Sequence, residues 1–415
     1  MKRYSEYKDS GVKWIGEIPE HWEIRRLKNV VLCNAETLSE NFPKDEVIKY
    51  VEISDVNYTS GITNIQRMPF GEAPSRARRI TKKNDVIVST VRTYLKAVAK
   101  IQEDGLIVST GFAVLHPLIG NSSFLSYFAL SESFIHNVIV NSKGISYPAI
   151  TASDLICIAM PLPPLSEQEA IVTYLDSKVD KIDEYISIAE KKIAALEELK
   201  QTIIAEAVTR GIHKDVPMKD SGVKWIGMIP EHWDCCKLKY FTRIKSGDAL
   251  TNNALSDTGK YKVYGGGDFM GFYDKYNVDA NTILIGRVGA RCGCVTITEE
   301  KAWATDNALI LIHFNINTKF LTYLLVAANL NSLSISNAQP LITGSKVKDS
   351  FIPIPPLPEQ QEIVSYLDSK VANINQLCQA ERSQIEKLKE YKQRLISDVV
   401  TGKVKVTNDS LNGRV

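Results

Sequence analysis

The chain has 415 residues, 44% hydrophobic and 24% charged, with a formal net charge of +2. This composition is typical of two or three globular domains, and the near-neutral balance gives no general reason to propose a nucleic acid or a membrane as partner. An apolar leader and a run of about 18 apolar residues are both missing, so we expect a cytoplasmic protein. The seven cysteines do not indicate a disulfide framework.

A segment near the N-terminus occurs twice. Residues 8–22, KDSGVKWIGEIPEHW, return as residues 219–233, KDSGVKWIGMIPEHW, with Met228 in place of Glu17. The mixture of Trp, Gly and Pro fits neither a periodic helix nor an alternating strand. We expect the tryptophans of both copies to build a frame or to contact a partner: Trp14, Trp22, Trp225 and Trp233.

The region after the first copy is locally basic. Eight Lys or Arg lie between Arg76 and Lys100, against a single acidic residue, Asp85. Such a stretch could neutralise DNA phosphates, although a solvated charged loop is the alternative for any one residue. The predicted DNA-binding residues here are Arg76, Arg78, Arg79, Arg92, Tyr94 and Lys96.

A second block is also duplicated. Residues 161–179, PLPPLSEQEAIVTYLDSKV, return 192 residues later as residues 353–371, PIPPLPEQQEIVSYLDSKV. The prolines read as an extended approach, and Ser166 with Glu169 matches a capping box, which predicts a helix start with Ser166 as N-cap. The shared polar and aromatic positions are further candidates for framework or partner contacts: Glu167, Gln168, Tyr174, Glu359, Gln360 and Tyr366.

Both copies of this block lead into a heptad seam. Apolar residues follow a 4-3 spacing from Leu175 onward and again from Leu367 onward, with Lys200 and Lys392 at the same place in the two seams. This spacing predicts two long helices that end near residues 211 and 402, where glycines stand, and that pack against each other in antiparallel orientation.

The second insert carries its own candidates. Short strands are predicted at NTILIGRVG and NALILIHF, as they are at NDVIVSTVR and GLIVSTGFAVLHP in the first insert, and helices at NSSFLSYFALSES and NTKFLTYLLVAAN. Arg92 and Arg287, 195 residues apart, are interpreted as equivalent positions. YGGGDFMG fails the Rossmann and P-loop spacings and is interpreted as a turn, with a tight loop near a ligand as the alternative. The predicted DNA-binding residues here are Lys245, Arg287 and Arg291.

Catalytic and metal chemistry find little support. Asp279, Glu299 and Lys301 form only a degenerate nuclease pattern without a counterpart in the first half. The cysteine spacings do not fit a zinc site, and no catalytic triad can be argued. We therefore expect no catalytic residue and no metal ligand.

These features predict an α+β protein with an internal repeat. Two α/β domains would be joined by two long antiparallel helices with pseudo-two-fold symmetry. The expected segments are a first domain at residues 1–160, a helix at 161–211, a second domain at 212–352, a helix at 353–402 and a polar tail at 403–415.

The two divergent inserts, each preceded by W.G.IPEHW and followed by P.PPL.EQ..IV.YLD with a long helix, resemble the specificity subunits of type I restriction-modification systems. The resemblance implies a non-catalytic subunit whose inserts are target recognition domains, each reading half of a split sequence in double-stranded DNA. It implies that the helices set the spacing and dock two methyltransferase subunits, and that restriction subunits join the complex.

The resemblance also implies that no cofactor is bound by this chain, with S-adenosylmethionine, ATP and magnesium held by partner subunits. It does not transfer base contacts, because the inserts are the variable part of the family. Two alternatives remain open at this point: the recognition part of a single-chain restriction-modification enzyme, and a coiled-coil scaffold that does not bind DNA.

Overall fold

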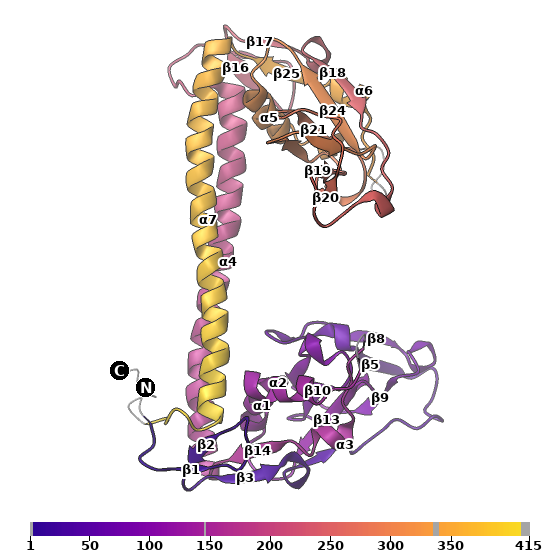
Figure 1. Cartoon of the computed structure of the whole chain (residues 1–415), viewed down its shortest axis with the longest axis vertical. Helices are drawn as coiled ribbons and strands as arrows, with labels where there is room; N and C mark the ends of the chain where they lie inside the picture. Colours follow the sequence, from indigo (N-terminus) through magenta and orange to yellow (C-terminus); the bar gives the residue numbers. More distant parts are fainter. Residues whose placement is uncertain (1–2, 145–146, 335–339, 408–415) are drawn as a thin grey trace. The chain divides into compact units, whose positions relative to one another are not determined.

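The computed structural model describes residues 3–144, 147–334 and 340–407 (Figure 1). It separates into two compact units. Unit 1 combines Met1–Ala189 with Ser383–Val415, and unit 2 is Glu190–Arg382. Each unit therefore contains one insert and a part of each long helix. The boundary between the units crosses both helices, whereas the sequence predicted each helix as a separate segment.

Unit 1 is built on two four-stranded sheets. The first has the order β11-β10-β13-β4 and is antiparallel throughout. The second has the order β8-β5-β12-β9, with β5 and β12 parallel. The strand bounds are β4 Val31–Cys33, β5 Val47–Val51, β8 Gln66–Pro69, β9 Ala77–Ile80, β10 Val86–Ser89, β11 Val98–Lys100, β12 Ile107–Ser109 and β13 Phe112–Pro117.

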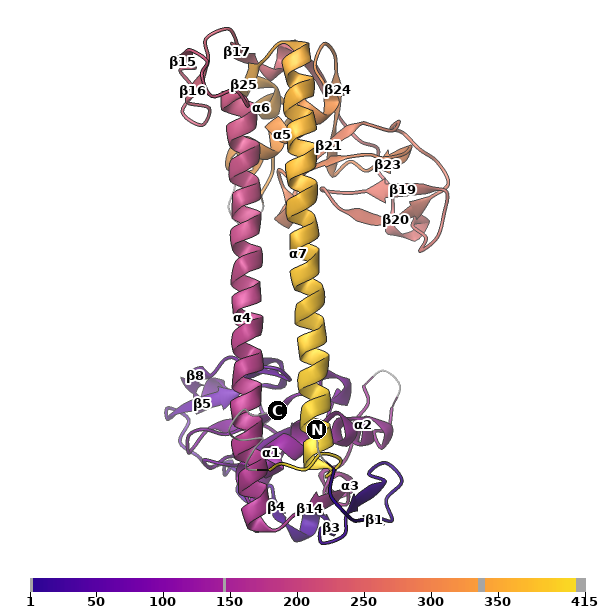
Figure 2. The same ribbon diagram turned by 90° about the vertical axis from the view of Figure 1, so that its left-hand side faces the viewer.

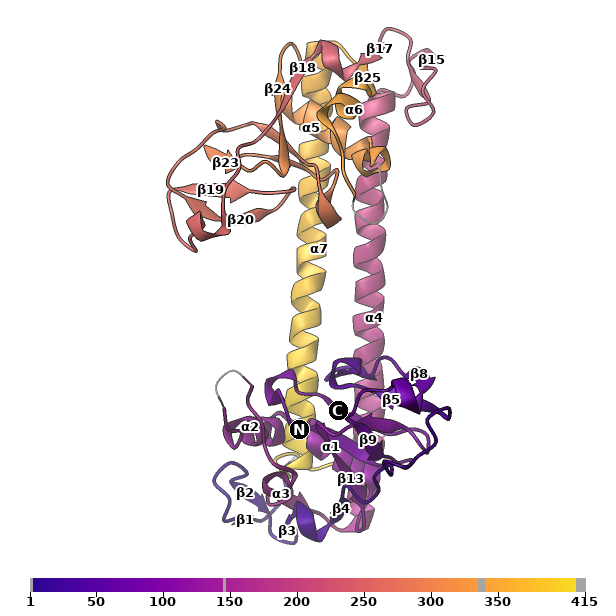
Figure 3. The ribbon, with the colours of Figure 1, turned by 90° about the vertical axis from the view of Figure 1, so that its right-hand side faces the viewer.

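Smaller elements complete unit 1. The first repeated segment forms the hairpin β1 (Tyr7–Asp9) and β2 (Glu17–Pro19), and β3 (Glu23–Arg26) pairs with β14 (Ala159–Leu162). A hairpin of two short strands, β6 and β7, lies between β5 and β8, and three helices follow β13. Their bounds are β6 Val56–Asn57, β7 Gly61–Ile62, α1 Ser122–Leu130, α2 Glu132–Val140 and α3 Ala152–Leu155. Figure 3 shows α1 beside the long helices of this unit.

Unit 2 repeats this topology with shorter connections. Its four-stranded sheet has the order β18-β24-β21-β22, and a three-stranded sheet has the order β20-β19-β23, with β19 and β23 parallel. The bounds are β15 Met218–Asp220, β16 Met228–Pro230, β17 Asp234–Lys237, β18 Thr242–Ser246, β19 Tyr261–Tyr264, β20 Phe269–Tyr273, β21 Ile283–Gly286, β22 Val295–Ile297, β23 Ala302–Ala304, β24 Ala308–His313, β25 Phe351–Ile354, α5 Thr318–Ala327 and α6 Gly344–Asp349. The predicted helices and strands of both inserts are confirmed, except that GLIVSTGFAVLHP forms two strands, β12 and β13, in different sheets. YGGGDFMG connects the antiparallel strands β19 and β20.

The two long helices are α4, Leu165–Arg210, and α7, Leu357–Val400. Within each unit they run side by side and antiparallel, as Figure 2 shows for unit 1. The heptad prediction is confirmed, because the seam residues are the buried ones, such as Val179 and Ile182 on α4 and Ile374 and Ile385 on α7. The apolar seam, together with α1 and α2 in unit 1 and α5 in unit 2, forms the main core of each unit.

The predicted capping box is wrong. The carbonyl oxygen of Pro164 accepts hydrogen bonds from the backbone N–H groups of Glu167 and Gln168, so α4 begins before Ser166 and the Ser166 side chain does not cap it. The proline ring fixes a backbone angle that suits the first helical turn, where a missing N–H costs nothing. At the other end, Gly211 and Gly402 adopt left-handed φ angles of 77° just beyond the two helices, as expected for helix stops.

Candidate nucleic-acid interface

The duplicated segments form the same framework contact in both units. The indole Nε1 of Trp22 donates to Glu167 Oε2 at 2.5 Å, and that of Trp233 donates to Glu359 Oε2 at 3.0 Å. His21 and His232 approach the same carboxylates at 3.1 and 2.8 Å. Both indoles are fully buried, so each glutamate at the start of a long helix holds the repeated segment against that helix.

The neighbouring glutamines link three elements. The side-chain nitrogen of Gln168 donates to the carbonyl of Pro163, and its oxygen accepts from the N–H of Asn121, the N-cap residue of α1. Gln360 repeats both bonds with Pro355 and Asn317, the N-cap residue of α5. In each unit, the glutamate and the buried glutamine together fix the orientation of the insert on its helix. This shared role explains why the sequence Glu-Gln occurs in both copies of the block.

The remaining framework candidates are placed unevenly. Trp14 packs against Phe128 with ring centroids 6.4 Å apart, and Tyr174 is buried. Their repeat counterparts Trp225 and Tyr366 are exposed. The two copies of the framework therefore share their hydrogen bonds but not all of their packing.

The basic stretch of unit 1 is partly neutralised. Arg76 Nε lies 2.8 Å from Glu52 Oε2, an interaction that raises the pKa of Arg76. The Arg78 guanidinium lies over the ring of Phe70, 4.9 Å from its centroid. Arg79 donates to the Thr37 hydroxyl at 3.2 Å, while its buried Nε has no hydrogen-bond partner within the described residues. The charge of Arg76 is therefore offset by a carboxylate, whereas Arg78 and Arg79 contact neutral groups.

Three other candidates gather on one turn, η4 (Thr93–Leu95). Arg92 precedes the turn and Lys96 follows it, and both have left-handed φ angles, of 50° and 53°. Tyr94, at the centre, is exposed. Arg92 lies over the ring of Tyr147 and Lys96 over the ring of Tyr58. Among the ion pairs of the described residues, neither cation takes part, so both charges are available.

The candidates of unit 2 surround a pair of glycine-rich loops. Arg287 Nη1 donates to the Ser246 hydroxyl at 2.9 Å, and its buried Nε has no hydrogen-bond partner in the described part of the chain. Arg291 pairs with Asp268, with 2.9 Å between Nε and Oδ2. Lys245 is exposed on β18.

Glycine is required where these loops meet. A Cβ on Gly286 would overlap the carbonyl oxygen of Gly266, so the loop after β21 touches the β19–β20 turn backbone to backbone. Arg287 is then held by its own N–H, which donates to Asn307, and by its carbonyl, which accepts from Ile342. The sequence pattern therefore fixes the position of an arginine backbone at the end of β21, an interior strand of the four-stranded sheet.

The predicted equivalence of Arg92 and Arg287 is wrong. The N–H of Arg287 donates to Asn307 and its carbonyl accepts from Ile342, and in unit 1 the matching bonds, with Gly111 and Ile150, are made by Thr90. Arg287 thus corresponds to Thr90, and turn η4 corresponds to η7 (Gly289–Arg291). STVR and LIGR both end in arginine, but the pairing of these two arginines is two residues out of register with the hydrogen-bond pattern.

Sequence reasoning also missed exposed residues beside the turn. Val91, Leu95 and Tyr147 are all exposed, although they are large and apolar or aromatic. Only the charge density of the stretch was visible in the sequence, since exposure depends on the turn geometry.

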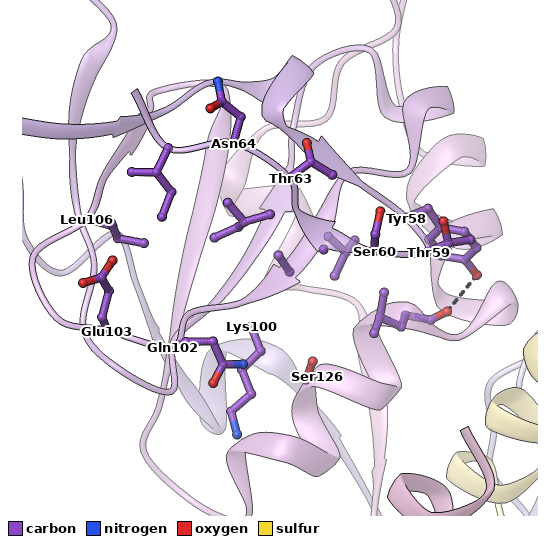
Figure 4. Close-up of a pocket in the computed structure, with 16 residues that line it drawn as sticks. Tyr58, Thr59, Ser60, Thr63, Asn64, Lys100, Gln102, Glu103, Leu106 and Ser126 are labelled. Carbon is purple, nitrogen blue, oxygen red and sulfur yellow. Dashed lines mark hydrogen bonds between the residues drawn. The ribbon is translucent and has the colours of Figure 1, made fainter. Parts of the chain in front are cut away.

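A pocket of about 660 Å³ lies between the β6–β7 hairpin and α1 in unit 1. Figure 4 shows Tyr58, Thr59 and Ser60 on one side and Ser126 on the other. Burial raises the pKa of Tyr58, whose hydroxyl donates to the carbonyl of Leu130 at 2.9 Å. Glu103 is the only carboxylate among the lining residues, which include no His or Cys.

Neither a metal-binding cluster nor a membrane-spanning helix is found in the described part of the chain. Among the described residues, no group of three or more His, Cys, Asp or Glu side chains is arranged to hold a metal ion. Within the same described ranges, no helix is both long and apolar enough to cross a membrane.

The model of the type I restriction modification DNA specificity domain matches residues 19–198 and 230–387, well over half of the chain. The chain belongs to the type I restriction-modification DNA specificity family. One match falls on each copy of the repeat, so the internal duplication is a duplication of this specificity domain.

Members of the specificity family match along nearly the full chain. The type I restriction enzyme MjaVIII specificity subunit of Methanocaldococcus jannaschii is 25% identical over 437 residues, covering 94% of this chain and 95% of that protein. The putative MjaX specificity subunit of the same organism is 26% identical over 441 residues, covering 96% and 98%. A solved chain from a study of complex assembly and conformational transition of a type I restriction-modification system has a TM-score of 0.72 at 25% identity, covering 93% of this chain and 99% of that one.

Proposed function

We propose that this specificity-family chain is the non-catalytic DNA-reading subunit of a type I restriction-modification complex in the cytoplasm, and that each unit reads one half of a split duplex target. The observation that carries this proposal is the repeated framework. The Trp–Glu and Gln contacts hold two different inserts on the same pair of helices. The same framework can therefore carry two domains that recognise different DNA sequences. Arg92, Lys96 and Lys245 form no ion pair with another described residue, so these cations on the two inserts can supply charge for DNA phosphates.

Two identical methyltransferase subunits are the partners we propose for the helices, with restriction subunits joining them. Exposed apolar residues support two docking sites. In unit 1 these are Tyr185 and Tyr391, which are 63% and 46% exposed, and in unit 2 they are Leu199 and Leu377, at 48% and 50%. Leu377 lies 192 residues after Tyr185, and Tyr391 lies 192 residues after Leu199.

These four residues occupy one kind of position on the helices. Each directly precedes a seam residue, so each lies on the flank of the helix pair and not in its core. In an antiparallel pair, the two flank residues of a unit lie on the same side. An apolar surface that occurs once per repeat is expected where the same partner binds twice.

The cofactors of the reaction belong to these partners in our proposal. S-adenosylmethionine would serve the methyltransferase subunits, and ATP with magnesium the restriction subunits. The chain has no Walker loop and no methyltransferase motif, which supports this division. The coiled-coil scaffold without DNA binding and the single-chain enzyme do not account for membership of a DNA specificity family.

Exchange of one insert tests the proposal. The full chain would be co-expressed with the methyltransferase subunit encoded beside it, and methylated adenines would be mapped on the host DNA. Replacing the residues between Trp22 and Pro161 by the insert of a relative should change one half of the methylated motif and leave the other half intact. Methylation that ignores the exchange would contradict the assignment of recognition to the inserts.

A further inference from the structure

Turn η4 of unit 1 has an uncommon backbone geometry and is held in place by side-chain hydrogen bonds. Residues with side chains rarely adopt left-handed φ angles, yet Arg92 and Lys96 both do so at the two ends of the turn. The turn is fixed by the hydrogen bond between the Thr93 and Ser142 hydroxyls, 2.9 Å long, and by the bond from Ser89 Oγ to the carbonyl of Val91. Strain held in place by its surroundings is a feature of ligand-binding segments.

The same turn exposes apolar surface between two cations. Tyr94 is 52% exposed, Leu95 45% and Val91 37%. Arg92 and Lys96 stand on either side, each over an aromatic ring, at 5.3 Å from the Tyr147 centroid and 5.4 Å from the Tyr58 centroid. Ring contacts orient both cations without neutralising them. An exposed tyrosine and leucine flanked by free positive charges match a DNA groove, whose walls are phosphates and whose floor presents apolar thymine methyl groups among the polar base edges.

Unit 2 has no such element at the equivalent place. Turn η7 carries Gly289 and Ala290, which offer little apolar surface, and its Arg291 is paired with Asp268. The two units therefore differ in chemistry at one shared position of the fold.

We propose that turn η4 is a base-contacting wedge: Tyr94 and Leu95 make apolar contacts with DNA bases in the half-site of unit 1, while Arg92 and Lys96 bind the phosphates on either side. The inference rests on the proposed function and adds a division of roles within one turn. It also means that unit 1 reads its half-site partly through apolar contact, and unit 2 reads its half-site by other groups.

The test uses the complex of the full chain with its methyltransferase subunit and a duplex carrying the motif found by methylation mapping. A second duplex without the motif reports non-specific binding. Dissociation constants would be measured at several salt concentrations for wild type, Tyr94→Ala, Tyr94→Phe and Arg92→Gln. Leu118→Ala, at another exposed apolar residue of unit 1, is the matched control.

Tyr94→Ala should weaken binding to the target duplex by about 10-fold, with an unchanged salt slope and little effect on the second duplex. Tyr94→Phe and Leu118→Ala should bind as wild type. Arg92→Gln should reduce the slope of log K against log salt by about 1 on both duplexes. A merely structural role of Tyr94 would weaken both duplexes together and lower the melting temperature.

The outcomes separate the two proposals. A wild-type complex that binds its target, with Tyr94→Ala binding equally well or losing both duplexes in parallel, would overturn the wedge and leave the proposed function standing. A wild-type complex that does not distinguish the two duplexes would remove the proposed function and the wedge with it.

Discussion

The ammonium group of Lys392 lies in the seam between α4 and α7 and donates to both carboxylate oxygens of Asp183, each 2.7 Å away. The repeat provides the same layer in unit 2, where Lys200 donates to Asn375 Oδ1 at 3.2 Å. Lys392 and Asn375 lie 192 residues after Lys200 and Asp183. The acceptor at this position is therefore a carboxylate in unit 1 and a neutral amide in unit 2, where Lys200 forms its ion pair with Glu197 on its own helix.

Removing the acceptor should cost more in unit 1 than in unit 2. Asp183→Ala leaves the buried Lys392 ammonium without its partner, and we expect a loss of about 1–3 kcal/mol in the free energy of unfolding. Asn375→Ala removes a neutral acceptor and should cost about 1 kcal/mol or less. Asp183→Asn, which copies the unit 2 layer, should fall between wild type and Asp183→Ala. Urea unfolding of the three variants measures this, and equal losses for Asp183→Ala and Asn375→Ala would contradict the ionic assignment.

The framework glutamates should be equally important in both units. Glu167→Ala and Glu359→Ala each leave a fully buried indole N–H unsatisfied, which costs about 1–3 kcal/mol. Glu362→Ala, which breaks an exposed pair with His213, is the control and should change stability by less than about 0.5 kcal/mol. Thermal unfolding of the three variants is the measurement. A loss confined to one unit would show that the repeated contact does not have the same role twice.

The glycine contact in unit 2 should be intolerant of any side chain. Gly286→Ala would force the loop after β21 away from Gly266, and we expect loss of the unit 2 half of the methylated motif. Gly289→Ala is the control on the same loop, because its Cβ would meet nothing within 4 Å. The control carries only the strain of its left-handed φ, about 1 kcal/mol. If Gly286→Ala keeps the full motif, the backbone contact does not position the reading residues.

Alkaline pH should weaken unit 1 through Tyr50. Burial, with a hydrogen bond to Glu52, raises the pKa of Tyr50 to about 12. The folded state holds the phenolic proton more tightly than the unfolded chain, whose tyrosine pKa is about 10. This contribution to stability is complete below about pH 10 and is lost as the pH rises towards 12. Tyr50→Phe should flatten the dependence of the urea midpoint on pH in this window, with exposed Tyr240→Phe as control. A parallel slope in wild type and Tyr50→Phe would refute the prediction.

The flank residues of the helices test the partner proposal. Tyr185→Ser with Tyr391→Ser should reduce the affinity of one methyltransferase copy by 10-fold or more, since exposed apolar anchors dominate such contacts. Leu199→Ser with Leu377→Ser should do the same to the other copy. Native mass spectrometry of the complex would then give one bound copy for either double variant. Two copies bound normally to both variants would place the docking surface elsewhere.

The long helices were predictable because a heptad seam is a local, periodic signal. The 4-3 spacing alone predicts the burial of Leu175, Val179 and Ile182. Lys392 is buried because it occupies a position of the same seam on α7. The helix start was not predictable from Ser166, because the backbone of Pro164 competes for the same N–H groups.

The candidate DNA-binding residues were only partly predictable. Charge density singled out Arg92 and Lys96, but the exposure of Leu95 and the pairing of Arg291 with Asp268 depend on loops that fold against distant segments. The duplication misled the comparison of the inserts, since Thr90 and Arg287 share a backbone position without sharing any side-chain chemistry.

The core of unit 1 joins residues from far ends of the sequence: Leu395 and Val399 on α7 pack in the same cluster as Ile18 and Trp22. Tyr7 donates to the carbonyl of Gly402, whose missing side chain leaves room for Pro19 and Trp22. During synthesis on the ribosome, the first insert must therefore wait for α7 before its core can close. A chain interrupted before α7 would lack this part of the core, so we expect the first insert to complete its folding only after the second insert and α7 have been synthesised.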